Sequence, residues 1–155
     1  MNAFRSQPKI QAGSVLLEGL ISILLFSVGI LAIVGLQGAS IKMSGDAQYR
    51  SDASLLANQL IGQMWASDRT PATLVGNFAS PTGSNYTNWL NSVNVSLPGV
   101  SGVQASQPVV TITPTQTADP TSTIAPSSVV TVTIYWNSPN EPVQAHKYTI
   151  VADII

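Results

Sequence analysis

The chain contains no cysteine, a single histidine and few charged residues. Without cysteine it can form neither a disulfide framework nor a thiolate metal site, so packing alone must hold its folded part together. Charged residues make up 8% of the chain, whereas they are about a quarter of an ordinary soluble protein. The six Lys and Arg residues form no cluster, which argues against nucleic-acid binding.

The sequence also lacks the common catalytic motifs. It has no Gly-x-Ser-x-Gly nucleophile elbow and no Gly-x-x-x-x-Gly-Lys phosphate loop. The sole histidine, His146, cannot build a multi-histidine metal site, and the carboxylates Asp119, Glu141 and Asp153 show no ligand spacing. We therefore expect no enzyme activity, no metal and no cofactor, and we interpret His146 as a solvated or structural residue.

A long apolar segment near the N-terminus is the strongest positive feature. Residues 19–36 carry no charge, and as a helix they would span about 27 Å, close to the ~30 Å hydrocarbon core of a bilayer. Arg5 and Lys9 precede the segment, and positive charge keeps that end of a span in the cytoplasm. We predict one membrane-spanning helix with a cytoplasmic N-terminus.

A single carboxylate, Glu18, stands at the start of this apolar segment, directly after the run Gly13-Ser14-Val-Leu-Leu. A charged side chain costs roughly 2.5–3.5 kcal/mol at the middle of a membrane helix and less near the interface, so its presence needs a reason. The arrangement resembles that of type IV prepilins and their relatives, which carry a basic leader ending in glycine and a glutamate five residues after the cut. The resemblance implies cleavage by a prepilin peptidase between Gly13 and Ser14, and N-methylation of Ser14.

The resemblance also implies a role for Glu18 and a narrower subtype. In the family this glutamate pairs with the terminal ammonium of a neighbouring subunit inside the filament core. The segments 17–21, 26–31 and 35–37 are similar to the PilV type of minor pilin. Ser14 departs from the usual phenylalanine, and the second half of the helix lacks the proline of many major pilins.

The implied partners are other minor pilins and the major pilin, the inner-membrane pilus assembly platform and the prepilin peptidase. The implied location is the bacterial inner membrane, crossed once, and then the pilus or cell surface. Two alternatives stay open. A pseudopilin of type II secretion would share the same signal, and a secreted β-rich binding module would be cut near Gly38–Ser40 and lose the helix.

Beyond the span, residues 38–67 continue as an amphipathic helix. Apolar residues recur there at helical spacing on one face, namely Tyr49, Ala53, Leu56, Leu60 and Met64. We expect Leu56, Leu60, Met64 and Trp65 to be core residues, and we expect the helix to end at residues 68–71, because the residue before a proline is disfavoured in a helix. One helix is thus predicted from about Ser14 to Ser67.

Residues 68–155 are predicted to form a β-rich domain. Strands are expected at Val109–Thr113, Val129–Trp136 and Lys147–Ala152, with a short fourth at Val93–Leu97, and the last two long strands should form a hairpin. The Ser/Thr-rich segment Thr111–Ser128 is interpreted as a solvated loop, and Asn137–Pro142 as a break. The predicted organisation is a leader (1–13), a transmembrane assembly helix (14–37), its continuation (38–67) and this domain, with a pilin-like α+β fold in which a long N-terminal helix packs on a small antiparallel sheet.

Overall fold

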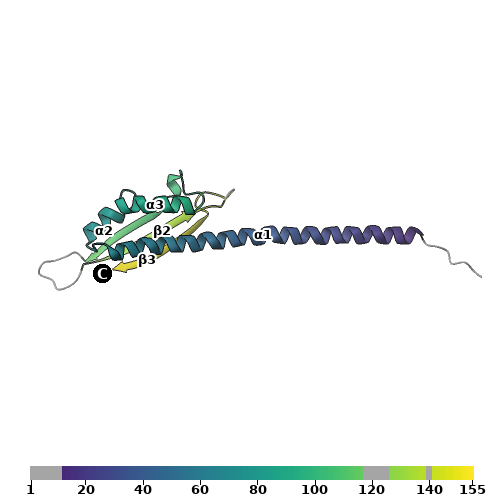
Figure 1. The fold of residues 1–155 in the computed structure, drawn as a ribbon, viewed down its shortest axis with the longest axis horizontal. Coiled ribbons are helices and arrows are strands. Elements are labelled where there is room, and N and C mark those ends of the chain that lie inside the picture. The colour runs from purple at the N-terminus through teal and green to yellow at the C-terminus, as the bar shows by residue number, and fades with distance from the viewer. Residues whose placement is uncertain (1–11, 117–125, 139–140) are drawn as a thin grey trace, which may run out of the picture. The chain divides into compact units, whose positions relative to one another are not determined.

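The computed structural model describes residues 12–116, 126–138 and 141–155 (Figure 1). Most of the predicted leader, the middle of the Ser/Thr-rich segment and part of the predicted break at 137–142 lie outside these residues. The chain divides into two compact units, Met1–Ser44 and Gly45–Ile155, which we call the N-terminal and C-terminal units. The order of elements is one long helix, two short helices, a 3-10 turn and three strands, which is an α+β arrangement.

Helix α1 (Ala12–Ala66) is 55 residues long and contributes to both units. Its bounds confirm the prediction of a single helix that ends just before Asp68–Pro71. In the C-terminal unit the predicted apolar stripe is buried at Ala53, Leu56, Leu60 and Met64, and Tyr49 packs against the same core. These residues cover the sheet because spacings of three and four keep them on one face of the helix.

Trp65 corrects one of these expectations. Its side chain is 45% exposed instead of buried, and its ring lies beneath the guanidinium of Arg69 at 5.8 Å. The reason is angular, because Trp65 directly follows the buried Met64 and adjacent residues of a helix point about 100° apart. The core position next to Leu60 is taken by Ile61.

Helix α2 (Pro71–Phe78) begins with proline, whose missing N–H would have no helical partner at that position. Asp68 supports the entry to α2. Its Oδ1 accepts the backbone N–H of Thr70 at 3.0 Å, and its Oδ2 accepts the hydroxyls of Thr70 and Thr73 at 3.3 and 3.1 Å. The backbone hydrogen bond from Thr70 lowers the pKa of the Asp68 carboxyl below its usual value of 3.8.

This lowered pKa predicts a small, acid-sensitive contribution to stability. A carboxyl whose folded-state pKa is depressed stabilises the fold fully above its unfolded value, here 3.8, and the contribution is lost as pH falls through the lower folded value. Asp68→Asn is therefore expected to lower the urea midpoint at about pH 6, where Asp68 is ionised, and its difference from the wild type should shrink as the pH falls below 3.8. A wild-type-to-variant difference that is the same at both pH values would contradict this assignment.

Helix α3 (Ser84–Ser96) replaces the short strand predicted at Val93–Leu97. A strand would place Val93, Val95 and Leu97 on one face, yet Val93 and Leu97 are buried whereas Val95 is 89% exposed. The buried residues Tyr86, Trp89 and Val93 instead follow the three- and four-residue spacing of a helix. Two helices, α2 and α3, thus precede the sheet in the part of the chain that was expected to be β-rich.

The sheet has the strand order β1-β2-β3 and is antiparallel throughout. Strand β1 (Val109–Gln116) runs past the predicted end at Thr113, and β2 (Ser127–Trp136) starts inside the segment interpreted as a loop. Strand β3 (His146–Ile154) pairs with β2 from Ser128↔Ile154 to Trp136↔His146, which confirms the predicted hairpin partners. Pro114 is tolerated because β1 is an edge strand, and the register shifts just after it.

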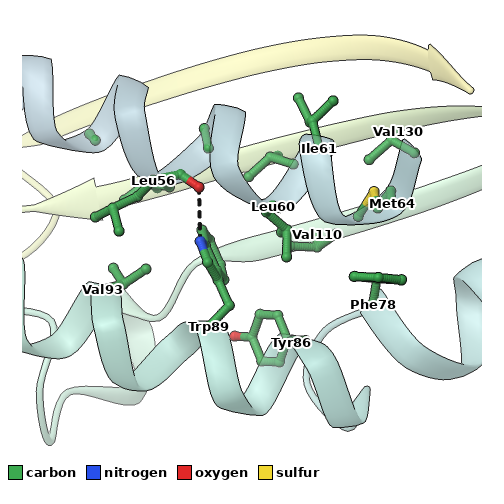
Figure 2. Packing of buried hydrophobic residues seen from close by; sticks show 14 of the residues in the cluster. Leu56, Leu60, Ile61, Met64, Phe78, Tyr86, Trp89, Val93, Val110 and Val130 are labelled. Carbon is green, nitrogen blue, oxygen red and sulfur yellow. Dashed lines mark hydrogen bonds between the residues drawn. The ribbon is translucent and has the colours of Figure 1, made fainter. Parts of the chain in front are cut away.

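One face of the sheet carries the core. Alternate residues of β2, from Ser128 to Trp136, are buried, and they meet α1 and α3 in a single cluster (Figure 2). Trp89 on α3 donates its indole N–H to the carbonyl of Leu56 on α1 at 2.9 Å, and Tyr86 donates its hydroxyl to the carbonyl of Pro108 at 2.8 Å. The polar atoms of Trp89 and Tyr86 therefore have hydrogen-bond partners where the two rings pack.

Candidate functional site

The described part of the N-terminal unit exposes a largely apolar helix surface. Every described residue from Gly13 to Ser44 has an exposed side chain, and Leu16, Phe26 and Leu31 are each 70% exposed or more. Apolar residues occur on all sides of the helix up to Leu36, so no polar face is left for water. A helix that is hydrophobic all round is stable only when other apolar groups or lipid surround it.

Within the described residues, α1 is the one helix long and apolar enough to cross a membrane. Local hydrogen bonding suits it to that environment. The hydroxyl of Ser27 donates to the backbone carbonyl of Ile23 at 2.7 Å, so one of the few polar groups of the segment is satisfied inside the helix. The backbone groups of a helix are likewise satisfied within it, which is the condition for crossing a bilayer.

The predicted processing and docking residues lie together in the first two turns of α1. Gly13 and Ser14 belong to its first turn, and Glu18 follows Ser14 by four residues, so Ser14 and Glu18 share one side of the helix. The first turn of any helix has backbone N–H groups without helical partners and is the part that most readily unwinds. Glu18 is exposed and is the sole charged residue between Gly13 and Ile41.

The C-terminal unit holds a polar cluster that the sequence did not reveal. His146 and Glu141 approach each other through Nε2 and Oε2 at 2.8 Å, and the imidazole stacks on the indole of Trp136 with ring centroids 5.6 Å apart. The backbone N–H of Ser138 donates to the same Glu141 oxygen, and the Ser138 hydroxyl donates to Oδ1 of Asp46 on α1. The surroundings of His146 are those of a structural residue, because it pairs with the carboxylate of Glu141 and stacks on the indole of Trp136.

This cluster offers no metal site within the part of the chain that the structure describes, because no three His, Asp or Glu side chains gather there in a group that could hold an ion. Its members were missed in the sequence because Asp46 and Ser138 are 92 positions apart and no motif links them. The one local signal was the proximity of Glu141 to His146, five residues later.

Comparisons with known proteins leave the family open. No protein-family profile, no curated protein and no solved structure matches this chain.

Proposed function

We propose that this protein is a minor pilin of the PilV type, which supports the assembly or priming of a type IV pilus. Two observations carry the proposal: every residue from 13 to 44 is exposed, and the C-terminal unit has its own core. Such a helix needs an apolar environment twice, first in the membrane and then among the equivalent helices of neighbouring subunits. The resemblance of residues 13–37 to prepilins supports the second step.

Glu18 supplies the electrostatic part of the proposed mechanism. Cleavage after Gly13 creates a terminal ammonium on Ser14, one helical turn, or about 6 Å along the axis, before the Glu18 carboxylate. A neighbouring helix shifted by about one turn would bring its ammonium level with this carboxylate. In a core with little water such a pair neutralises both charges, whereas an unpaired carboxylate there costs several kcal/mol.

The proposed partners follow from this mechanism. The helix of the protein would pack against those of the major pilin and other minor pilins, and the prepilin peptidase and the inner-membrane assembly platform would act on it before assembly. The protein would sit in the bacterial inner membrane with its N-terminus in the cytoplasm until it enters the filament. The C-terminal unit would then be displayed at the pilus surface.

The test is the N-terminal mass of the mature protein, expressed in bacteria with and without a prepilin peptidase. We expect a peptidase-dependent start at Ser14, with or without one added methyl group, and retention of α1. Gly13→Leu should abolish the cut, whereas Gly38→Leu, the matched substitution at the alternative secretory boundary, should leave it unchanged. A mature N-terminus near residue 40, or no cleavage, would contradict the pilin interpretation.

The docking role of Glu18 is tested in the same strains. Glu18→Gln keeps the size of the side chain and removes its charge, so we expect normal cleavage but loss of the subunit from filaments sheared off the cell surface. Equal incorporation of Glu18→Gln and wild type would contradict the pairing role. If the protein is cleaved at Ser14 but supports protein secretion in place of surface filaments, it is a type II secretion pseudopilin.

A further inference from the structure

A polar groove runs between α1 and the start of β3 in the C-terminal unit. Two adjoining cavities of about 440 and 560 Å³ form it, and they share Ala47 and Arg50 as a common wall. Trp136 and His146 line the first, and Ser54 and Tyr148 line the second. We call this feature the α1–β3 groove. Its two parts together are large enough for several side chains of a bound chain.

The groove borders an unpaired strand edge. Within the described residues β3 pairs with β2 alone, so its outer edge has no neighbouring strand. The opposite edge differs, because the backbone N–H of Ser80 donates to the carbonyl of Val110 on β1, and the Val110 N–H donates to the Ser80 hydroxyl oxygen. An unpaired edge presents backbone N–H and C=O groups to which an extended segment can add as a further strand.

Two hydrogen-bond donors that line the groove have no acceptor. Arg50 makes no hydrogen bond or ion pair with any part of the chain that the structure describes. The side chain of Trp136 is 3% exposed, and its Nε1 is buried without a partner. A buried N–H without an acceptor is costly, and it marks a place where a ligand oxygen would be favoured.

The nearby carboxylates do not serve these donors. Oδ1 of Asp46 accepts the hydroxyl of Ser138, and Oε2 of Glu141 faces His146 and the Ser138 N–H. Lys147 lines the same cavity as Arg50 and Trp136 and adds a second cation to it. The groove thus holds two cations, Arg50 and Lys147, and an indole N–H without an acceptor, which together fit a carboxylate.

We propose that the α1–β3 groove binds an extended peptide segment of another protein chain, which adds to the edge of β3 and places an acidic side chain against Arg50 and Trp136. Backbone hydrogen bonds to β3 supply affinity for any extended chain, and the carboxylate supplies selectivity. Alternate side chains of the segment enter the groove beside α1. The proposal uses residues of the C-terminal unit alone and does not rest on the pilin assignment.

The test uses the full chain in detergent micelles and three octapeptide libraries. Each library has Glu, Gln or Lys fixed at a central position, and the other positions are drawn from Val, Ile, Thr and Ser. Retention is measured by mass spectrometry, and amide hydrogen exchange locates the bound peptide. We expect the Glu library to be retained about tenfold more than the Gln library, with slower exchange at β3 amides and no change at β1.

Variants distinguish the proposed carboxylate contact from non-specific peptide binding. Arg50→Gln should reduce the Glu-to-Gln ratio to near one, and Trp136→Phe, which keeps an aromatic ring and removes the donor, should reduce it in part. Lys147→Gln, which removes the second cation of the groove, should also lower the ratio in part, whereas Arg69→Gln, the matched removal of a guanidinium that does not line the groove, should leave it unchanged. Retention of none of the libraries, a Glu preference that survives Arg50→Gln, or protection at β1 would each overturn the proposal.

Discussion

Replacing Trp89 with alanine is expected to lower the free energy of unfolding of the C-terminal unit by about 3–5 kcal/mol, the range for deleting a large buried aromatic side chain. Trp89 joins α3 to α1 through its hydrogen bond to the Leu56 carbonyl and contacts the ring of Tyr86, with centroids 6.0 Å apart. The substitution therefore removes core volume and a link between two helices. Chemical unfolding of the full chain in micelles, followed by circular dichroism, measures the loss.

The matched control is the exposed tryptophan on α1. Trp65→Ala removes the same side chain from a position that is 45% exposed, where its recorded aromatic contact is with the Arg69 guanidinium. Trp65 loses much less buried surface on truncation than Trp89, and a cation–π contact at an exposed site is worth about 0.5–1 kcal/mol, so the loss should be well below that of Trp89→Ala. Trp89→Phe should fall between the two, because it keeps most of the buried ring and loses the hydrogen bond. Similar losses for Trp65→Ala and Trp89→Ala would contradict the burial of Trp89 in the core.

The second large effect is expected at Gly99, in the connection between α3 and the 3-10 turn η1 (Gln104–Ser106). Gly99 has φ +74°, a conformation that costs other residues about 1–2 kcal/mol, and a Cβ there would overlap the side-chain amide of Asn137. Asn137 cannot easily move away, because its Oδ1 is buried and its backbone N–H donates to the Pro98 carbonyl. Gly99→Ala should therefore cost about 3 kcal/mol, since overpacking adds to the backbone strain.

Gly102 distinguishes the effect of backbone strain from the effect of the overlap with Asn137. It has almost the same backbone angle, φ +75°, but nothing lies within 4 Å of a Cβ built on it, so Gly102→Ala should cost about 1–2 kcal/mol from strain alone. The double variant Gly99→Ala/Asn137→Ala should recover part of the loss of Gly99→Ala, because it removes the overlapping group. Equal destabilisation by the two glycine substitutions, measured by the same unfolding experiment, would show that the overlap with Asn137 has no effect.

Residue patterns predicted the parts of the fold that repeat over many residues. The four- and three-residue spacing through Leu56 and Leu60 predicted the buried face of α1, and the β-branched run before Trp136 predicted β2. The proline at position 71 and the residues before it predicted where α1 ends. These features follow from the spacing of apolar residues along the chain, which is the strongest sequence signal for helices and strands.

The patterns failed where a short segment is decided by its surroundings. Val93–Leu97 alternates like a strand, but burial of Trp89 and Val93 on the same side selects a helix that began at Ser84. Trp65 was predicted to be a core residue together with Met64, whereas its angular position on α1 directs it outward. The α1–β3 groove could not be predicted at all, because Arg50 and Trp136 come together only through the tertiary fold.

The hydrophobic core draws no side chain from residues 13–44, since its first member along the chain is Ala53. Mutations between Ser14 and Ile41 should therefore go unnoticed in any screen that scores thermal stability or protease resistance of the C-terminal unit. A genetic survey based on such a screen would rate the apolar half of α1 as tolerant of change. Selection at those positions would become visible only in an assay that requires the membrane or a neighbouring subunit.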